Sequence, residues 1–257
     1  ITVLGIDKTF KRMIAYGIEE SDAVTAVSHD LVNQTIRQLQ VKKEIDVIYN
    51  FVNEKEYFKK ERGFIKNQYG IDSDDKVIIH ISNFRKVKRI QDVIYTFSII
   101  QENVKSKLIL VGDGPELQTA FEVVNKLNLK NKVLFLGKQK NISDLLSISD
   151  IKLLMSEQES FGLVLLEAMA CEVATIGTNV GGIPEVISHG ETGYVVELGD
   201  TEAAAKYAIH LLKDEDLLKK FSKQGLNRAQ SLFHSEEIVN QYIALYKKLL
   251  IKNGLGD

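Results

Sequence analysis

The sequence has 257 residues, of which 44% are hydrophobic and 26% charged, and these proportions are ordinary for a soluble globular protein. Its 33 basic and 35 acidic side chains give a formal net charge of −2, so no overall field favours nucleic acid. No apolar run reaches about 18 residues, so no membrane span is expected, and the single cysteine, Cys171, rules out an internal disulfide and fits a reducing cytoplasm. The chain opens on Ile1 rather than methionine, from which we expect a cut inside a longer protein.

Short β-prone runs alternate with helical patterns, which predicts an α/β fold with a parallel sheet. The first fifty residues predict helices at 8–20 and 29–39 and strands at 23–27 and 45–48. These four elements are too few to close a sheet, so they indicate the tail of a Rossmann-like domain. Residues 49–53 carry two asparagines and suit either a hinge or an ordinary loop.

From residue 76 onward the alternation is clearer. Strands are expected at 77–81, 108–111, 133–136, 151–154, 173–176 and 194–196, and helices at 90–102, 116–127, 142–147, 162–171, 202–213, 215–231 and 236–251. Strands this apolar are typical of a parallel sheet that is covered on both faces. Open sheets of this kind bind ligands at the carboxyl ends of their strands. We therefore expect the site in the segments that follow the strands, at 82–84, 112–115, 137–139, 156–159 and 177–182.

One such segment, Glu159-Ser-Phe-Gly-Leu-Val-Leu-Leu-Glu167, joins a strand to an apolar helix. Eight residues at about 1.5 Å rise would separate its two glutamates by roughly 12 Å. The carboxyl groups of a glycoside hydrolase pair lie only about 5–9.5 Å apart. Between the glutamates, the backbone N–H groups of Ser160, Phe161 and Gly162 lie at a helix N-terminus, which favours phosphate. The spacing predicts two clamps on a long ligand that has a charged group between them.

A basic run, Arg85 to Arg89, follows the strand expected at 77–81. Lysine and arginine in this position are well placed to meet a diphosphate, and Lys88 is the strongest candidate. A solvated charge cluster is the alternative.

The glycine-rich segments are less specific. Gly112-Asp-Gly-Pro115 lacks the Gly-x-Gly-x-x-Gly fingerprint and favours a tight turn. The Gly137-to-Gln139 segment suits a turn or contact with a base edge, and Gly181-Gly-Ile-Pro-Glu185 suits a turn that opens a short helix. The five histidines show no metal-ligand spacing, and there is no Gly-x-Ser-x-Gly elbow, so metal catalysis and serine hydrolysis are unsupported. Cys171 is expected to be a buried thiol.

Together these residues resemble the retaining glycosyltransferases of the GT-B fold, family 4. Glu159 and Glu167 match the Glu-x7-Glu signature, Arg85 and Lys88 match the basic strand end, and both glycine-containing loops stand where that family has them. The resemblance covers essentially the whole chain. It implies a remnant of the N-terminal acceptor domain at 1–50, a complete Rossmann-like donor domain at 51–234, and a C-terminal helix at 235–257 that packs back towards the N-terminal domain.

Four stretches, at 7–28, 48–51, 80–89 and 159–171, look like the family members that join N-acetylglucosamine to L-malate in the first step of bacillithiol biosynthesis. The resemblance implies UDP-N-acetylglucosamine (UDP-GlcNAc) and L-malate as small-molecule substrates of a cytoplasmic bacterial enzyme. It implies no cofactor and no metal, and it leaves the oligomeric state open.

Roles follow residue by residue from the same resemblance. Glu159 would touch the donor sugar and Glu167 the uridine ribose, and Asn83 and Lys88, with Arg85, would hold the diphosphate. The catalytic residues expected are Glu159, Lys88 and Arg85; the substrate-binding residues expected are Asn83, Gly112, Gln139, Ser160, Phe161, Gly162, Leu163 and Glu167. Glu172 stands where relatives have glycine, so Glu172→Gly is expected to raise the melting temperature if this position has positive φ.

Alternatives remain open at this point. One is a family-4 transferase with another acceptor, a second is a non-catalytic module that binds nucleotide sugars, and a third is a nucleotide-sugar epimerase. Because the acceptor loops of the family are absent, we expect the chain to bind UDP or UDP-GlcNAc but to turn over slowly or not at all.

Overall fold

The structure, a computed structural model, describes residues 8–254. Ile1, Asp7 and the last three residues of the 235–257 segment, on which parts of the expectations fall, lie outside the described residues. In the described part, no helix is both long and apolar enough to cross a lipid bilayer.

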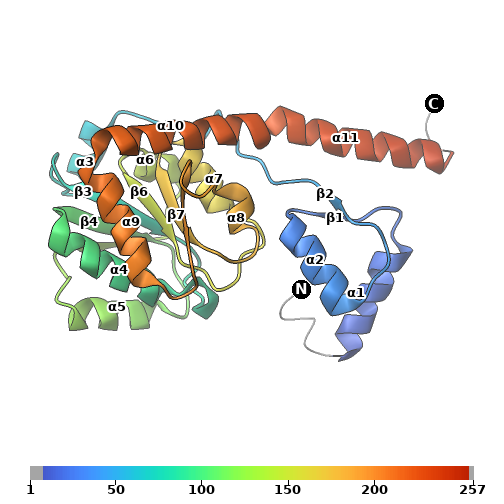
Figure 1. The fold of residues 1–257 in the computed structure, drawn as a ribbon, viewed down its shortest axis with the longest axis horizontal. Helices are drawn as coiled ribbons and strands as arrows, with labels where there is room; N and C mark the ends of the chain where they lie inside the picture. Colours follow the sequence, from blue (N-terminus) through green and yellow to red (C-terminus); the bar gives the residue numbers. More distant parts are fainter. Residues whose placement is uncertain (1–7, 255–257) are drawn as a thin grey trace.

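A six-stranded parallel sheet forms the centre of the larger part of the molecule (Figure 1). Its strands are β3 (Lys76–Ile81), β4 (Ser106–Val111), β5 (Val133–Gly137), β6 (Ile151–Leu154), β7 (Ala174–Thr178) and β8 (Gly193–Val196). The strand order is β5-β4-β3-β6-β7-β8, so the chain builds outward from β3, crosses back to β6, and then builds outward on the other side. The point where β3 and β6 lie side by side is the topological switch point, where open α/β sheets bind their ligands.

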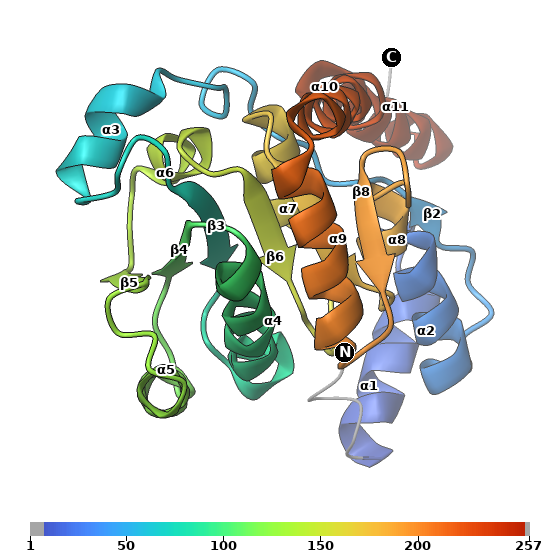
Figure 2. The same cartoon turned by 60° about the vertical axis from the view of Figure 1, so that its left-hand side comes forward.

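Helices cover both faces of this sheet (Figure 2). On one face, α4 (Ile90–Asn103), α5 (Leu117–Lys126) and α9 (Thr201–Lys213) bury their apolar sides in the largest hydrophobic cluster. On the other face lie α6 (Ile142–Ser147), α7 (Leu163–Ala170) and the short α8 (Ile183–Val186). Apart from the partly exposed edge strand β5, the strands between the two layers are largely buried, which explains their continuous apolar sequence. The predicted α/β class and all six predicted strands of this sheet are confirmed.

Residues 8–50 form a small separate layer beside the large sheet (Figure 1). It contains α1 (Lys8–Glu20), β1 (Thr25–Ala26), α2 (His29–Leu39) and β2 (Asp46–Val47), with β1 and β2 paired in parallel. Its own hydrophobic core is small and centres on Ala26, Leu39, Val41 and Ile45. The predicted order of these elements is confirmed, although both strands are shorter than predicted.

Residues 49–53 lead from this layer to the last two helices of the chain, where Val52 bridges His234. There α10 (Glu215–Leu232) is followed by α11 (Ser235–Lys252). Glu54 accepts hydrogen bonds from the N–H and hydroxyl groups of Ser235, at 2.9 Å each, and so fixes the start of α11. The helix then extends beyond the sheet (Figure 1). Several of its large apolar side chains are exposed, namely Val239, Ile243, Tyr246, Leu250 and Ile251.

Two elements were not predicted. The helix α3 (Arg62–Gln68) is short and has no helical periodicity, but contacts with residues outside the helix hold it. Arg62 pairs with Asp150 at 2.8 Å, and Lys66 donates to the carbonyl of Asp75 at 2.6 Å. The 3₁₀ helix η1 (Lys86–Lys88) lies within the charged run, where apolar patterning is absent.

The estimate of roughly 12 Å between the two glutamates needs correction. It used the helical rise over all eight residues, whereas α7 begins only at Leu163, so Glu159 lies outside the helix.

The condition attached to the Glu172→Gly prediction is met, because φ is 54° at Glu172. Its carboxylate pairs with Lys59 at 3.0 Å.

Candidate functional site

A cavity of about 930 Å³ opens at the carboxyl edge of the sheet, between α2 and the switch point. From the large sheet it is lined by segments that follow β3, β6 and β7, and from the small layer by one face of α2. The lining residues include Asp30, Gln34, Arg37, Asn83, Arg85, Lys88, Glu157, Glu159, Ser160 and Gly181. The site is thus on the edge that the sequence predicted.

Lys88 and Glu159 form an ion pair inside this cavity, with 2.6 Å between Nζ and Oε2. Their side chains are only 19% and 15% exposed. Lys88 ends η1 after β3, whereas Glu159 follows β6, so the pair joins the two strands at the switch point. A hydrogen bond of 2.8 Å from the N–H of Glu157 to the carbonyl of Val87 fixes the two segments to each other. The structure therefore brings together two of the three residues predicted to be catalytic, and the third, Arg85, lines the same cavity.

Glycines determine where Glu159 lies. The N–H of Gly182 donates to the carbonyl of Glu159 at 3.0 Å. Gly181 has a φ of +56°, and a Cβ added there would lie 1.7 Å from the same carbonyl oxygen. No residue with a side chain fits this close approach of two backbones. The loop at 181–185, predicted as a turn that opens a short helix, therefore positions the carboxylate.

The N-terminus of α7 matches the expected phosphate cradle in part. Gly162 caps the helix with φ +96° and no side-chain hydrogen bond. Within residues 8–254, no group accepts a hydrogen bond from the N–H of Ser160, Phe161 or Gly162. Ser160 lines the cavity, but Phe161 is 1% exposed and packs in the core, and Gly162 and Leu163 are not among the lining residues. Of the four residues expected to form the cradle, only Ser160 therefore lines the cavity.

Gly112 and Gln139 were predicted to bind substrate but do not line the cavity. The N–H of Gly112 donates to the carbonyl of Gly137 at 2.8 Å. A Cβ added to Gly112 would lie 1.8 Å from the carbonyl oxygen of Ser82. Gln139 donates to the carbonyl of Leu136 at 2.5 Å. Gly112 thus allows the turn after β4 to approach the segment that carries Asn83.

Glu167 lies one turn into α7 and is not among the residues that line the cavity. Burial raises the pKa of its carboxyl group, whereas Lys152 and a hydrogen bond from Tyr57 act in the opposite direction. Burial, followed by the charge of Glu167, raises the pKa of Tyr57 in turn. Lys152 was missed at the sequence level, although a lysine in the otherwise apolar run at 151–155 was a visible signal.

Glu185 attaches α2 to the large sheet. Its carboxylate accepts hydrogen bonds of 2.9 Å from the backbone N–H groups of His29 and Asp30, at the start of α2. The hydroxyl of Tyr49 donates to the same carboxylate at 3.1 Å. A carboxylate at a helix N-terminus is stabilised by the helix dipole as well as by these bonds. Because Ser28 also donates to the carbonyl of Ser160 at 2.7 Å, α2 is held directly over the cavity.

The strand end at β3 is ordered by a neutral histidine. His80 is fully buried, and burial lowers its pKa to about 3. Its Nδ1 is 3.0 Å from the carbonyl of Leu153 and its Nε2 is 2.9 Å from the hydroxyl of Ser82. A neutral ring with the proton on Nδ1 donates to the carbonyl and accepts from the hydroxyl, and Ser82 accepts in turn from the N–H of Phe84.

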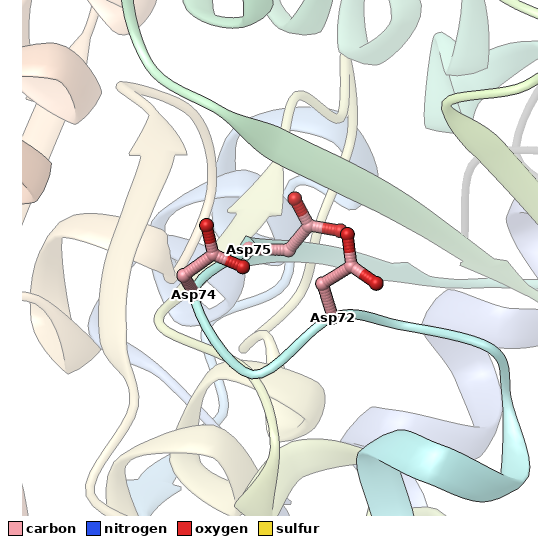
Figure 3. Close-up of side chains that lie close together, drawn as sticks. All are labelled: Asp72, Asp74 and Asp75. Atoms are coloured by element: carbon pink, nitrogen blue, oxygen red, sulfur yellow. The ribbon is translucent and has the colours of Figure 1, made fainter.

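A second group of acidic residues lies at the opposite edge of the sheet. Asp72, Asp74 and Asp75 come together on the loop that precedes β3 (Figure 3). The ammonium of Lys105 lies 3.1, 2.9 and 3.6 Å from their respective carboxylates. This lysine supplies the counter-charge for the cluster, which is therefore a structural ion network and not part of the cavity.

The chain belongs to the family described as glycosyl transferases group 1, whose family model matches residues 61–228. Over 99% of its length it is 53% identical to the N-acetyl-alpha-D-glucosaminyl L-malate synthase of Bacillus anthracis, of which it covers 67%. It is also 27% identical over 95% of its length to the capsular polysaccharide biosynthesis glycosyltransferase CapM of Staphylococcus aureus, again covering 67% of that protein.

Solved structures agree with this assignment. The sucrose-phosphate synthase of Thermosynechococcus elongatus superposes with a TM-score of 0.86 at 25% identity, covering 96% of this chain and 63% of that one. HepE of Anabaena, crystallised with UDP and glucose, superposes with a TM-score of 0.84 at 25% identity, over 93% of this chain and 66% of that one. The chain thus spans about two thirds of the length of these relatives. The fold is of the GT-B type, and the protein is a glycosyltransferase.

Proposed function

We propose that the chain supplies the donor-binding part of a retaining glycosyltransferase that transfers N-acetylglucosamine from UDP-GlcNAc to L-malate. The 53% identity to a relative named for this reaction is the observation that carries the proposal. In the same proposal the enzyme acts in the bacterial cytoplasm, at the first step of bacillithiol biosynthesis. The buried, free Cys171, whose pKa is raised by burial to about 12, is compatible with a reducing compartment.

The donor diphosphate would lie beside Lys88, Arg85 and Asn83. Both charged side chains line the cavity, and Lys88 is already oriented by Glu159 at 2.6 Å. An ammonium that is fixed before the ligand arrives needs little reorganisation when negative charge develops on the departing UDP. The unbonded N–H groups around Ser160 would add further donors to the same phosphate.

Glu159 would meet the hydroxyl groups of the sugar, since a carboxylate only accepts hydrogen bonds and sugar hydroxyls donate them. We assign no nucleophilic role to it, because in the proposed retaining reaction the acceptor attacks the face from which UDP leaves.

Metal-independent transfer is part of the proposal. The positive charge that stabilises the leaving group would come from Lys88 and Arg85, as charge-assisted hydrogen bonds. Donor affinity should therefore be the same with EDTA and with added Mg²⁺. A Mg²⁺-dependent gain of tenfold or more would contradict this part of the proposal.

Calorimetric titration with three nucleotide sugars tests the donor. UDP-GlcNAc is expected to bind more tightly than UDP-glucose, and GDP-mannose to bind weakly or not at all. A clear preference for GDP-mannose would refute the proposed donor. L-malate and alternative acceptors then need to be compared in a product assay with the full-length protein.

Lys88→Met tests the diphosphate site, with Lys86→Met as its matched control. Both lysines lie on η1, but Lys86 is exposed and does not line the cavity. A hydrogen bond to a charged group contributes about 1.5–3 kcal/mol, so Lys88→Met should weaken UDP-GlcNAc binding by about 10- to 100-fold. Equal affinities of the two variants for UDP-GlcNAc would show that Lys88 does not bind the diphosphate.

A further inference from the structure

A lysine is completely enclosed in the middle of the sheet. Lys152 is the second residue of the central strand β6 and is 0% exposed. Its neighbours in the register of the sheet, Ile79 of β3 and Thr175 of β7, are also 0% exposed. Among the described residues, no acceptor forms a hydrogen bond with its Nζ. A buried ammonium without such partners is costly, and lysine is almost never fully buried unless it is paired.

The charged groups that act on Lys152 are those of the donor site. They are Glu167 of α7, Glu159 after β6, and Lys88 of η1. His80 of β3 also interacts with it, and this ring is neutral because burial lowers its pKa to about 3. Lys152 thus shares its electrostatic environment with the ion pair in the cavity and with the carboxylate that matches the second position of the Glu-x7-Glu signature.

Burial lowers the pKa of Lys152 from 10.5 to about 7. At neutral pH, free protein therefore contains both the charged and the neutral form of this side chain. A bound diphosphate adds negative charge close to Lys88 and partly cancels the repulsion that this ammonium exerts on Lys152. The added negative charge and the weaker repulsion from Lys88 both favour the protonated form of Lys152.

We propose that Lys152 is a positioning residue of the donor site, which takes up a proton when a nucleotide sugar binds and, once charged, keeps the Glu167 carboxylate ionised for the ribose hydroxyls. This inference rests on the proposed function, because it assumes that a nucleotide sugar occupies the cavity. The coupling is reciprocal: if the donor favours protonated Lys152, protonation of Lys152 favours the donor. Donor affinity then decreases as the pH rises.

The test is titration of the 257-residue chain with UDP-GlcNAc in buffers of different ionisation enthalpy, from pH 6 to pH 9. UDP-GlcNAc is a suitable probe because its phosphates do not titrate in this range. At pH 7 the wild-type chain should take up at most about half a proton per bound ligand. If binding raises the pKa of Lys152 by one, the affinity should be about tenfold weaker at pH 9 than at pH 6.

Lys152→Met should abolish the proton uptake and flatten the pH dependence, whereas Lys126→Met, at an exposed position on α5, should behave as the wild type. Equal uptake by the wild-type chain and Lys152→Met would overturn the inference. Binding without any proton uptake would overturn it too and leave the proposed function intact. Absence of UDP-GlcNAc binding by the wild-type chain at every pH would instead contradict the proposed function.

A second measurement needs no variant. In the chain labelled with ¹³C-lysine, one resonance should titrate near neutral pH, and UDP-GlcNAc should shift its midpoint to higher pH. An unchanged midpoint in the presence of saturating ligand would refute the coupling.

Discussion

Replacing Lys152 with methionine is expected to stabilise the fold, and to do so more at pH 7 than at pH 9. Lys152 is 0% exposed, and burial lowers its pKa from 10.5 to about 7. This difference in pKa between the unfolded and folded states means that, when Lys152 is protonated in both, its charge destabilises the folded state by about 5 kcal/mol. Methionine has a similar length and no charge, so the variant removes this cost and keeps the side-chain volume.

The sign of the pH dependence follows from proton binding. Between about pH 7 and pH 10.5 the unfolded chain holds a proton on Lys152 that the folded chain has largely lost, so wild-type stability rises with pH. The cost of the lysine is therefore about 4 kcal/mol at pH 7 and about 2 kcal/mol at pH 9. The variant also loses the attraction between Lys152 and Glu167, which reduces its gain in stability. The change of the stability difference with pH is therefore a sharper measure than the absolute size of that difference.

Urea denaturation of the wild-type chain and Lys152→Met at pH 7, 8 and 9 measures this difference, and Lys126→Met serves as the exposed control. The free-energy difference between Lys152→Met and the wild type should fall by about 2 kcal/mol across the range. A difference that stays constant with pH, or a variant less stable than the wild type throughout, would refute the reasoning.

Three further predictions concern the backbone and the attachment of α2. Gly181→Ala should weaken UDP-GlcNAc binding at least tenfold, because the added Cβ would lie 1.7 Å from the carbonyl oxygen of Glu159. Gly190→Ala is the control, since Gly190 also has a positive φ, +79°, but open space around it, and this variant should bind normally. Equal effects of the two variants would exclude the steric explanation. Glu172→Gly should be more stable than Glu172→Ala by about 1 kcal/mol in thermal unfolding, because φ is 54° there and both variants lose the same ion pair. Glu185→Gln should weaken the charge-assisted bonds to the start of α2 by about 1–3 kcal/mol and speed proteolytic cleavage within residues 20–50; unchanged cleavage would argue against this attachment.

Much of the secondary structure could be predicted from the sequence, because side-chain burial repeats every two residues in a strand and every 3.6 in a helix. The long helices were found from the second of these repeats, whereas the strands at 77–81 and 151–154, which are buried on both faces, were found from their short continuous apolar runs. Elements without such periodicity were missed. The helix α3 depends on the contacts of Arg62 with Asp150 and of Lys66 with Asp75, both outside the helix. The 3₁₀ helix η1 lies within a charged run.

For the candidate site, the sequence by itself determined which residue types stand at the ends of the strands, including Lys88 and Glu159. Only the tertiary structure decided which of them meet. The pair is 71 residues apart, and it forms because β3 and β6 adjoin at the switch point. In the same way, Glu185 holds the start of α2 from about 155 positions away, and Lys152 is enclosed by neighbouring strands on both sides. Local patterning specifies the kind of each element, whereas strand order and burial depend on pairing between distant segments, which no local pattern contains.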